Sequence, residues 1–123
     1  MGGERSVMTE VTELLQVAAQ AEQLRQQAIA ANVANLETPG YRRVDVRFEQ
    51  LLAKAMESED PADIRQLEPE FFNPMNTPLK SNGNDVTLDD EVGRMVENSL
   101  RHKTYVRLLD KKYKQMEMAA QTP

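Results

Sequence analysis

A repeat of apolar residues in the last third of the chain limits its possible folds more than any other feature. From residue 88 to residue 120, the positions reached by alternating steps of four and three all hold apolar side chains except two, Ser99 and His102. Such steps place side chains on one face of a helix, and a repeat held over several heptads is typical of coiled coils. The repeat predicts a long helix with an apolar contact face, or seam, that consists of Leu88, Val92, Met95, Val106, Leu109, Tyr113 and Met116.

A second helical pattern begins near the amino end. Its small and apolar residues also recur at helical spacing, and we assign its seam to Val7, Val11, Leu14, Ala18, Ala21 and Ala28. The string Thr38-Pro39-Gly40 should end this helix, because the residue before proline is driven out of the α region and glycine supplies a left-handed turn. The sequence therefore predicts a mainly α chain with two long terminal helices.

Charge indicates how the two helices pair. Residues 1–37 carry two basic and five acidic side chains, whereas residues 100–114 carry six basic and one acidic. Antiparallel pairing would bring these segments together, with Glu10, Glu13 and Glu22 beside Arg101, Arg107 and Lys111. We therefore expect an antiparallel, coiled-coil-like hairpin.

The segment between the helices is short and mixed. Residues 43–48 alternate polar and apolar side chains, as a short strand does, and residues 49–56 could form two helical turns. Beyond them, regular structure should fade, because acidic residues and four of the six prolines follow before the turn signal Asn82-Gly83. We divide the chain into an amino-terminal helix (1–37), a loop-rich, proline-containing middle segment (38–86) and a carboxyl-terminal helix (87–123).

Composition argues against several classes of function. The chain has 15 basic and 20 acidic residues, a net charge of −5, so nucleic acid is not an expected partner. It has no cysteine and one histidine, His102, and we expect no catalytic site, metal or cofactor. No segment reaches the roughly 18 apolar residues that a membrane span requires, so we expect no direct membrane insertion. The amino end also lacks the basic start and apolar run of a signal peptide.

The most specific signal lies at the end of the first predicted helix. Asn32 and Asn35 are three residues apart, are poor helix formers and carry amides that can bond neighbouring backbone. From the residues alone, this string is a helix terminus with a Pro-Gly stop. It also resembles the signature Asn-x-x-Asn-x-x-Thr-Pro-Gly-Tyr of the bacterial flagellar axial proteins, the rod and hook family. The fixed positions of that signature are filled here by Asn32, Asn35, Thr38, Pro39, Gly40 and Tyr41.

The carboxyl-terminal half resembles the proximal-rod members of the same family. This likeness is carried by the string Asn82-Gly83-Asn84-Asp85-Val86, by the acidic residues Asp89, Asp90 and Glu91, and by the trio Asn98-Ser99-Leu100. From these we assign as motif residues Gly83, Asn84, Val86, Asn98, Ser99 and Leu100. The resemblance implies a structural subunit of the basal-body rod that polymerises helically with copies of itself and other rod proteins, transmits motor torque and forms the wall of the export channel. Further implied partners are the inner-membrane ring, or rod adaptor, and the flagellar export apparatus. The implied location is the periplasmic rod, reached without a cleaved signal peptide.

The resemblance also leads to roles for the motif residues. Asn32 and Asn35 would hydrogen-bond across helices, the Thr38-Pro39-Gly40 turn would direct the chain outward, and Tyr41 would brace that turn. Several apolar residues lie outside the seams and would stay exposed in an isolated hairpin, namely Leu15, Val17, Leu24, Ile29, Val96, Leu100 and Leu108. We therefore expect the lone chain to be partly disordered and to become ordered on assembly.

An alternative function uses the same apolar stripes. A soluble helical-hairpin adaptor or export chaperone could hold one partner helix in its groove. Such a protein should be a well-folded monomer or dimer at low concentration, so circular dichroism measured against concentration separates the two hypotheses.

Overall fold

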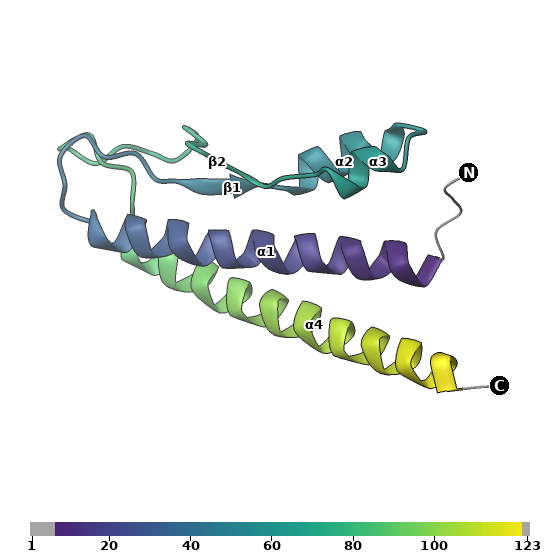
Figure 1. Ribbon diagram of the computed structural model, residues 1–123. Helices are drawn as coiled ribbons and strands as arrows, with labels where there is room; N and C mark the ends of the chain where they lie inside the picture. The colour runs from purple at the N-terminus through teal and green to yellow at the C-terminus, as the bar shows by residue number, and fades with distance from the viewer. Residues whose placement is uncertain (1–6, 122–123) are drawn as a thin grey trace.

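The computed structural model describes residues 7–121 of the 123-residue chain. Its two longest elements are α1 (Val7–Ala34) and α4 (Leu88–Gln121), which run antiparallel and pack against each other (Figure 1). The prediction of a mainly α chain with two long paired terminal helices is confirmed. Within residues 7–121, no helix combines the length and apolarity that crossing a bilayer requires.

The middle segment contains four short elements: β1 (Asp45–Arg47), α2 (Glu49–Glu57), α3 (Ala62–Arg65) and β2 (Glu70–Phe72). The strands β1 and β2 pair antiparallel, with Val46 opposite Phe71. Both β1 and α2 lie where the sequence pattern predicted them.

The helix α3 and the strand β2 correct the expectation that regular structure fades after residue 57. Pro61 stands at the N-cap of α3 with a φ of −58°, which the proline ring favours, and its missing N–H costs nothing at a helix start. Pro69 precedes β2 and does not interrupt its pairing with β1. The prolines of this segment therefore border regular structure and do not abolish it.

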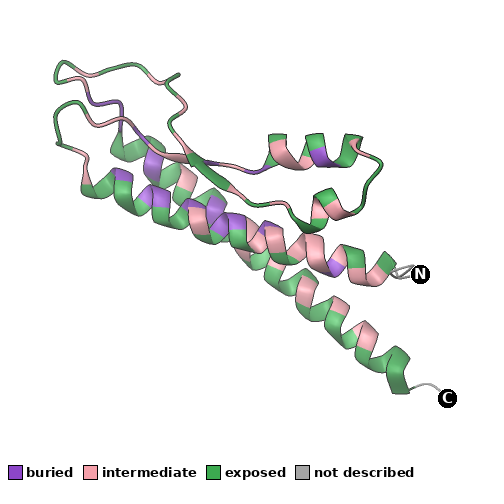
Figure 2. Ribbon diagram, turned by 45° about the horizontal axis from the view of Figure 1, so that its top comes forward, coloured by how far each residue is buried: buried purple, intermediate pink, exposed green. Residues whose placement is uncertain are grey.

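The helix α1 is the middle of three layers. The middle segment lies along one side of α1 and α4 along the other (Figures 1 and 2). The apolar core is small: Phe48, between β1 and α2, packs with Ala18 and Ala21 of α1, and Tyr105 of α4 is among the half-buried residues around them. Alanine side chains let both outer layers approach the α1 backbone closely.

The predicted seam of α4 is largely exposed in the single chain. Leu88, Val92, Met95, Val106 and Tyr113 are each 44–48% exposed, while Leu109 and Met116 are half-buried. The row one position earlier faces α1 instead, and it includes Glu91, Asn98 and Tyr105. The polar members of this row have hydrogen-bond partners in α1, which decides the orientation of α4. Figure 2 accordingly shows mostly exposed residues along α4.

The predicted seam of α1 divides along its length. Ala18, Ala21 and Ala28 are buried, Val11 and Leu14 are half-buried, and Val7 is 74% exposed and lies outside the contact. Both ribbon views show α1 and α4 separating toward Val7 and Gln121 (Figures 1 and 2). We call this the open end of the hairpin, and the opposite end, at the turn after α1, the closed end.

Candidate functional site

The motif at the end of α1 and the motif that precedes α4 meet at the closed end of the hairpin. The Gly40 N–H donates to the Asn82 carbonyl at 2.9 Å, and a Cβ on Gly83 would lie 3.5 Å from the Gly40 Cα. Both glycines have left-handed backbones, with φ of +75° at Gly40 and +82° at Gly83, which glycine adopts without a steric penalty. The two glycines thus allow two turns to pack backbone against backbone.

Asn84 joins the second motif to the end of α1. Its side-chain amide donates to the carbonyls of Asn35 and Thr38, at 2.8 Å each, and its Oδ1 accepts from the Val86 N–H at 2.7 Å. Both Asn84 and Val86 are fully buried. Both carbonyls belong to the turn that follows α1, so Asn84 holds this turn in place from a distant part of the chain.

Asn32 is the centre of the closed-end contacts. It is 1% exposed, and its Nδ2 donates to the Val44 carbonyl at 2.9 Å and to Glu91 Oε2 at 3.1 Å. Its Oδ1 accepts from the Val44 N–H at 2.8 Å and from the Tyr41 hydroxyl at 3.0 Å. The amide therefore uses all of its hydrogen-bonding capacity, and it connects α1 to α4 and to the chain leaving the turn.

The other motif residues act more locally. Asn35 donates to the Ala31 carbonyl at 2.8 Å and accepts from the Thr38 hydroxyl at 3.1 Å, both close in sequence. The expected cross-helix bond thus occurs at Asn32, whereas the Asn35 side chain bonds its own helix end and turn. Burial, followed by the negative charges of Glu91 and Asp85, raises the pKa of the Tyr41 hydroxyl.

Two buried carboxylates of the second motif, to which the sequence assigned no role, complete the closed end. Asp85 accepts from the Arg43 N–H at 2.5 Å and from Arg42 Nε at 3.0 Å. Glu91 is fully buried and accepts from Arg94 at 2.8 Å. Arg43 Nε lies 3.7 Å from Glu91 Oε1, and it is buried without a hydrogen-bond acceptor among the described residues. Pairing each carboxylate with a cation offsets the cost of removing its charge from water.

A second buried polar cluster joins α1 to α4 halfway along the hairpin. Glu22 is 1% exposed, and its carboxylate accepts from Arg25 at 2.5 Å and from Arg101 at 2.9 Å. Asn98 donates to the Glu22 carbonyl at 2.6 Å and to its carboxylate at 3.2 Å. The Glu22–Arg101 pair is one that the charge pattern predicted.

Arg25 extends this cluster to the middle segment, where it also pairs with Glu49 at the start of α2. Burial opposes the charged form of each partner, but their hydrogen bond and mutual attraction outweigh it. The pKa of Arg25 is therefore raised and that of Glu49 lowered. The Arg101–Glu22–Arg25–Glu49 chain of contacts thus connects all three layers.

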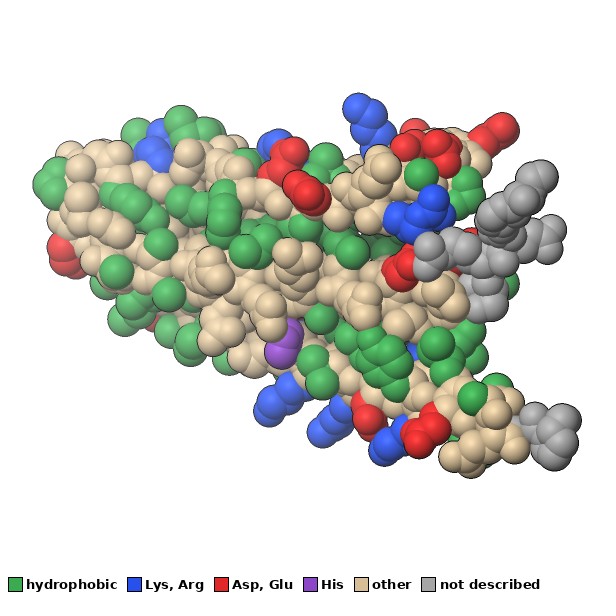
Figure 3. Space-filling model, in the orientation of Figure 1, with side chains coloured by type: hydrophobic (Ala, Val, Ile, Leu, Met, Phe, Trp, Pro, Cys, Tyr) green, Lys and Arg blue, Asp and Glu red, His purple; other side chains and the backbone are tan. Residues whose placement is uncertain are grey.

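The remaining predicted residues lie on the outside of α4. Ser99 and Leu100 are exposed, with Leu100 at 61%, and His102 is half-buried. Exposed apolar side chains on one side of the helix define what we call the outer face of α4: Leu88, Val92, Met95, Val96, Leu100, Val106 and Tyr113. Hydrophobic side chains are visible on the surface over α4 in Figure 3. Soluble monomers rarely leave so many apolar residues exposed on one element, which indicates a contact surface.

The polar clusters are not arranged as a metal centre. No group of three or more His, Asp or Glu side chains within residues 7–121 is placed to hold a metal ion. The carboxylates of both clusters instead accept from arginine and asparagine side chains, so their arrangement ties the layers together.

The chain was compared with known proteins. A family model described as flagella basal body rod protein matches residues 15–42, which contain the α1 residues of both polar clusters and the Asn-Thr-Pro-Gly-Tyr motif. Curated relatives named flagellar basal body rod protein FlgB also match. The relative from Borreliella burgdorferi is 30% identical over 101 residues, which cover 64% of this chain and 72% of the relative. The relative from Buchnera aphidicola is 24% identical over 106 residues, and that from Proteus mirabilis 28% over 109, each covering 75% of this chain and 80% of the relative.

Proposed function

This chain belongs to the family of the flagellar basal body rod protein FlgB, and on that premise we propose that it polymerises helically in the proximal part of the rod. It is a structural subunit of the flagellar basal-body rod and not an enzyme. Membership also implies assembly with other rod components. In our proposal, the polymer transmits motor torque, forms the wall of the export channel, and contacts the inner-membrane ring or rod adaptor and the export apparatus.

The observation that carries this proposal is the outer face of α4. Its apolar side chains are exposed in the single chain, although most of them follow a repeat typical of helix contacts, namely Leu88, Val92, Met95, Val106 and Tyr113. Burying a large apolar side chain fully is worth about 1.5–3 kcal/mol, so covering several of them would strongly favour assembly. A contact that joins two different surfaces without closing a ring generates a helical filament, the form that a rod requires.

The buried polar clusters support the proposed role in transmitting torque. Asn32, Asn84 and Glu22 each connect segments that are far apart in the sequence, and each is almost fully buried. A twist applied to one layer would have to break buried hydrogen bonds before another layer could slip. The three layers would therefore turn as one unit.

Export as an unfolded chain, followed by assembly in the periplasmic rod, fits the small core. The chain has no cysteine, hence no disulfide to break, and its buried apolar cluster consists of Ala18, Ala21 and Phe48. Unfolding it would expose little apolar surface, which lowers the cost of passing through a narrow channel. We propose this route in place of a cleaved signal peptide.

Deleting the gene tests the function. We expect motility to be lost, the inner-membrane ring to remain, and the chain itself to be found in basal bodies purified from the complemented strain. A motile deletion strain would overturn the proposal. An export chaperone or adaptor would instead be absent from purified basal bodies, so the fractionation separates the alternative function from the proposed one.

A further inference from the structure

The α2–α3 part of the middle segment is strongly acidic. Residues 57–68 carry five acidic side chains and one basic, Arg65. All five acidic residues are exposed: Glu57, Glu59, Asp60, Asp63 and Glu68. They lie toward the open end of the hairpin, in the layer on the far side of α1 from α4 (Figures 1 and 3).

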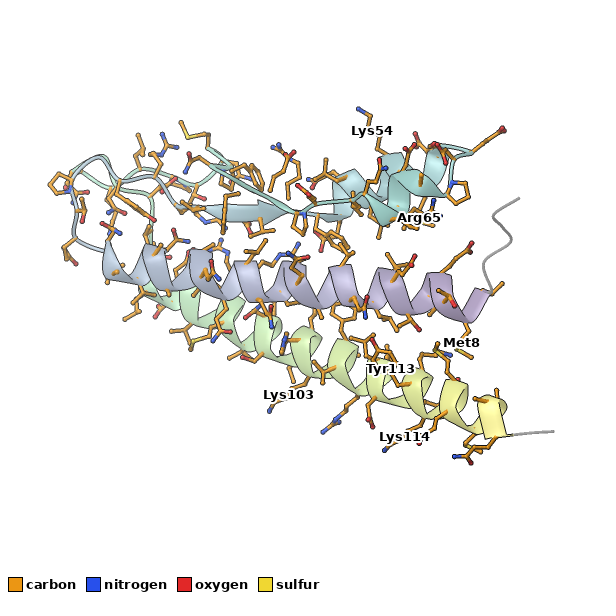
Figure 4. All side chains as sticks on the ribbon, viewed as in Figure 1. Met8, Lys54, Arg65, Lys103, Tyr113 and Lys114 are labelled. Carbon is orange, nitrogen blue, oxygen red and sulfur yellow. The ribbon has the colours of Figure 1, made fainter. Side chains whose placement is uncertain are left out.

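The stretch of α4 toward the same open end is strongly basic. Residues 103–114 carry five basic side chains and one acidic, Asp110. Lys103, Arg107, Lys111 and Lys114 are exposed, and Lys112 is half-buried. Figure 4 shows Lys103 and Lys114 pointing away from α1, and in Figure 3 lysine and arginine side chains gather along the edge of the molecule formed by α4. The acidic and basic stretches are thus on opposite faces of one molecule and cannot pair within it.

The closed halves of the same two faces carry exposed apolar side chains, which on α4 alternate with the exposed acidic residues Asp89, Asp90 and Glu97. On α4, Leu88, Met95 and Leu100 are 46–61% exposed, and they precede the basic stretch. In the middle segment, Met75 and Leu79 are 57–58% exposed and lie in the loops beyond β2. Each face therefore has exposed apolar side chains at the closed end and a stretch of mostly like charges at the open end, and the two stretches are opposite in sign.

We propose that the outer face of α4 docks on the middle segment of a second copy of this chain, with both copies pointing the same way. Only this orientation places the basic stretch 103–114 on the acidic stretch 57–68 while the apolar halves also meet. The reverse orientation would set charged groups against apolar ones. This inference rests on the proposed function and names the two surfaces through which copies would associate.

The geometry of the two surfaces makes the contact open-ended. Because they are different surfaces on opposite faces, each copy that donates its α4 still offers its own middle segment to the next copy. The charge complementarity should guide orientation and make association depend on salt, since ion pairs near the surface are screened at high ionic strength. The apolar halves should supply the part of the attraction that salt does not weaken.

Disulfide trapping tests the register directly, because the natural chain has no cysteine. The double variant Glu59→Cys/Lys111→Cys should form a ladder of covalent multimers on mild oxidation of the concentrated full chain. In the matched control Glu59→Cys/Glu97→Cys, the second cysteine is also at an exposed position of α4 but lies about 21 Å closer to the closed end. We expect no ladder there. Equal ladders from both variants, or none from either, would overturn the inference.

Charge reversal tests the same contact without cysteines. Changing Lys103, Lys111 and Lys114 to Glu, or changing Glu57, Glu59 and Asp63 to Lys, should each raise the concentration for half-association by about tenfold at low salt. Mixing the two variants should restore association, since each supplies the surface that the other lacks. Circular dichroism would confirm that each variant is folded. Loss of association that mixing does not restore would overturn the inference.

A motility assay in the deletion strain separates this inference from the proposed function. If the deletion abolishes motility but both reversed variants restore it fully, the rod role stands and the charged contact is wrong. If a reversed variant fails in the cell while Glu59→Cys/Lys111→Cys forms no ladder, the contact lies with a different rod protein, and the assignment to a second copy falls. A motile deletion strain would remove the proposed function itself.

Discussion

The side-chain amide of Asn98 donates to the backbone carbonyl of Glu22 across 2.6 Å, and the same amide lies 3.2 Å from the Glu22 carboxylate. Asn98 belongs to α4 and Glu22 to α1, so this contact fixes how far one helix is shifted along the other. A one-residue rotation of α4 would bury Ser99 in its place, and serine is too short to reach both acceptors. The polar pair therefore selects the orientation of α4 that leaves its apolar repeat exposed.

Replacing Asn98 with Leu should lower the free energy of unfolding by about 1–3 kcal/mol, because the buried Glu22 carbonyl and carboxylate would lose a donor that leucine cannot replace. Urea unfolding followed by circular dichroism measures this. The control is Glu97→Leu, at the neighbouring exposed position, which should change the free energy of unfolding by about 0.5 kcal/mol or less. Equal losses in the two variants would show that the buried amide has no special role.

The two asparagines of the helix-end motif should behave differently. Asn32→Leu breaks four hydrogen bonds in a site that is 1% exposed, and it removes the donor to Glu91 Oε2 and both side-chain bonds to the Val44 backbone. We expect a loss of about 2–4 kcal/mol in the free energy of unfolding. Asn35→Leu removes local bonds at a half-buried site and should cost about 1 kcal/mol or less.

Asn35 still has a proposed role in assembly. Because its side chain contributes little to the contacts between layers, Asn35→Leu should leave a folded monomer while impairing rod formation. Electron microscopy of basal bodies from the deletion strain complemented with this variant provides the measurement. Rods of normal length and number would remove the assembly role, whatever the stability of the monomer.

The Tyr41 hydroxyl should make stability sensitive to alkaline pH. The pKa of this hydroxyl is raised above the usual value of about 10, so the folded state favours the neutral hydroxyl. The stability that the neutral hydroxyl contributes is therefore complete below about pH 10 and is lost as the pH rises through the raised pKa. Tyr41→Phe removes the bond to Asn32 and should cost about 0.5–1.5 kcal/mol near pH 8. The difference between wild type and variant should shrink by about pH 11 in urea unfolding. A constant difference would contradict the buried hydrogen bond.

Much of the fold follows from local sequence patterns. The long helices, β1 and α2 were predictable because helical spacing, strand alternation and a Pro-Gly stop all act within a few residues. The strand β2 was not, since Glu70-Phe71-Phe72 shows no clear alternation and depends on pairing with β1. Sequence-distant pairing of this kind leaves little trace in a single sequence.

The orientation of α4 could not be predicted from apolar spacing, because two neighbouring rows of that helix compete. One row is apolar and the other carries Glu91 and Asn98, whose burial depends on partners in α1. A signal was present in α1, where Glu22, Arg25 and Asn32 continue the helical spacing that begins at buried Ala18. Charged and amide residues on a row of small residues indicate a polar contact between helices, and that pattern could have revealed the second cluster.

The free chain should open progressively from the open end toward the closed end. Buried contacts are concentrated in residues 18–32 of α1 and 91–105 of α4, whereas toward the open end the helices separate and side-chain contacts are sparser, among them Gln16 with Tyr113 at 2.5 Å. Long helices with little tertiary packing are marginally stable in water, so the predicted disorder of the lone chain should be confined to these outer turns. Hydrogen exchange on dilute monomer should be fast in residues 7–14 and 108–121 and slow in the inner segments, and the gradient should disappear in assembled rods. Strong, uniform protection of the dilute chain would mean that both helices are stable without neighbours, and the case for ordering on assembly would fail.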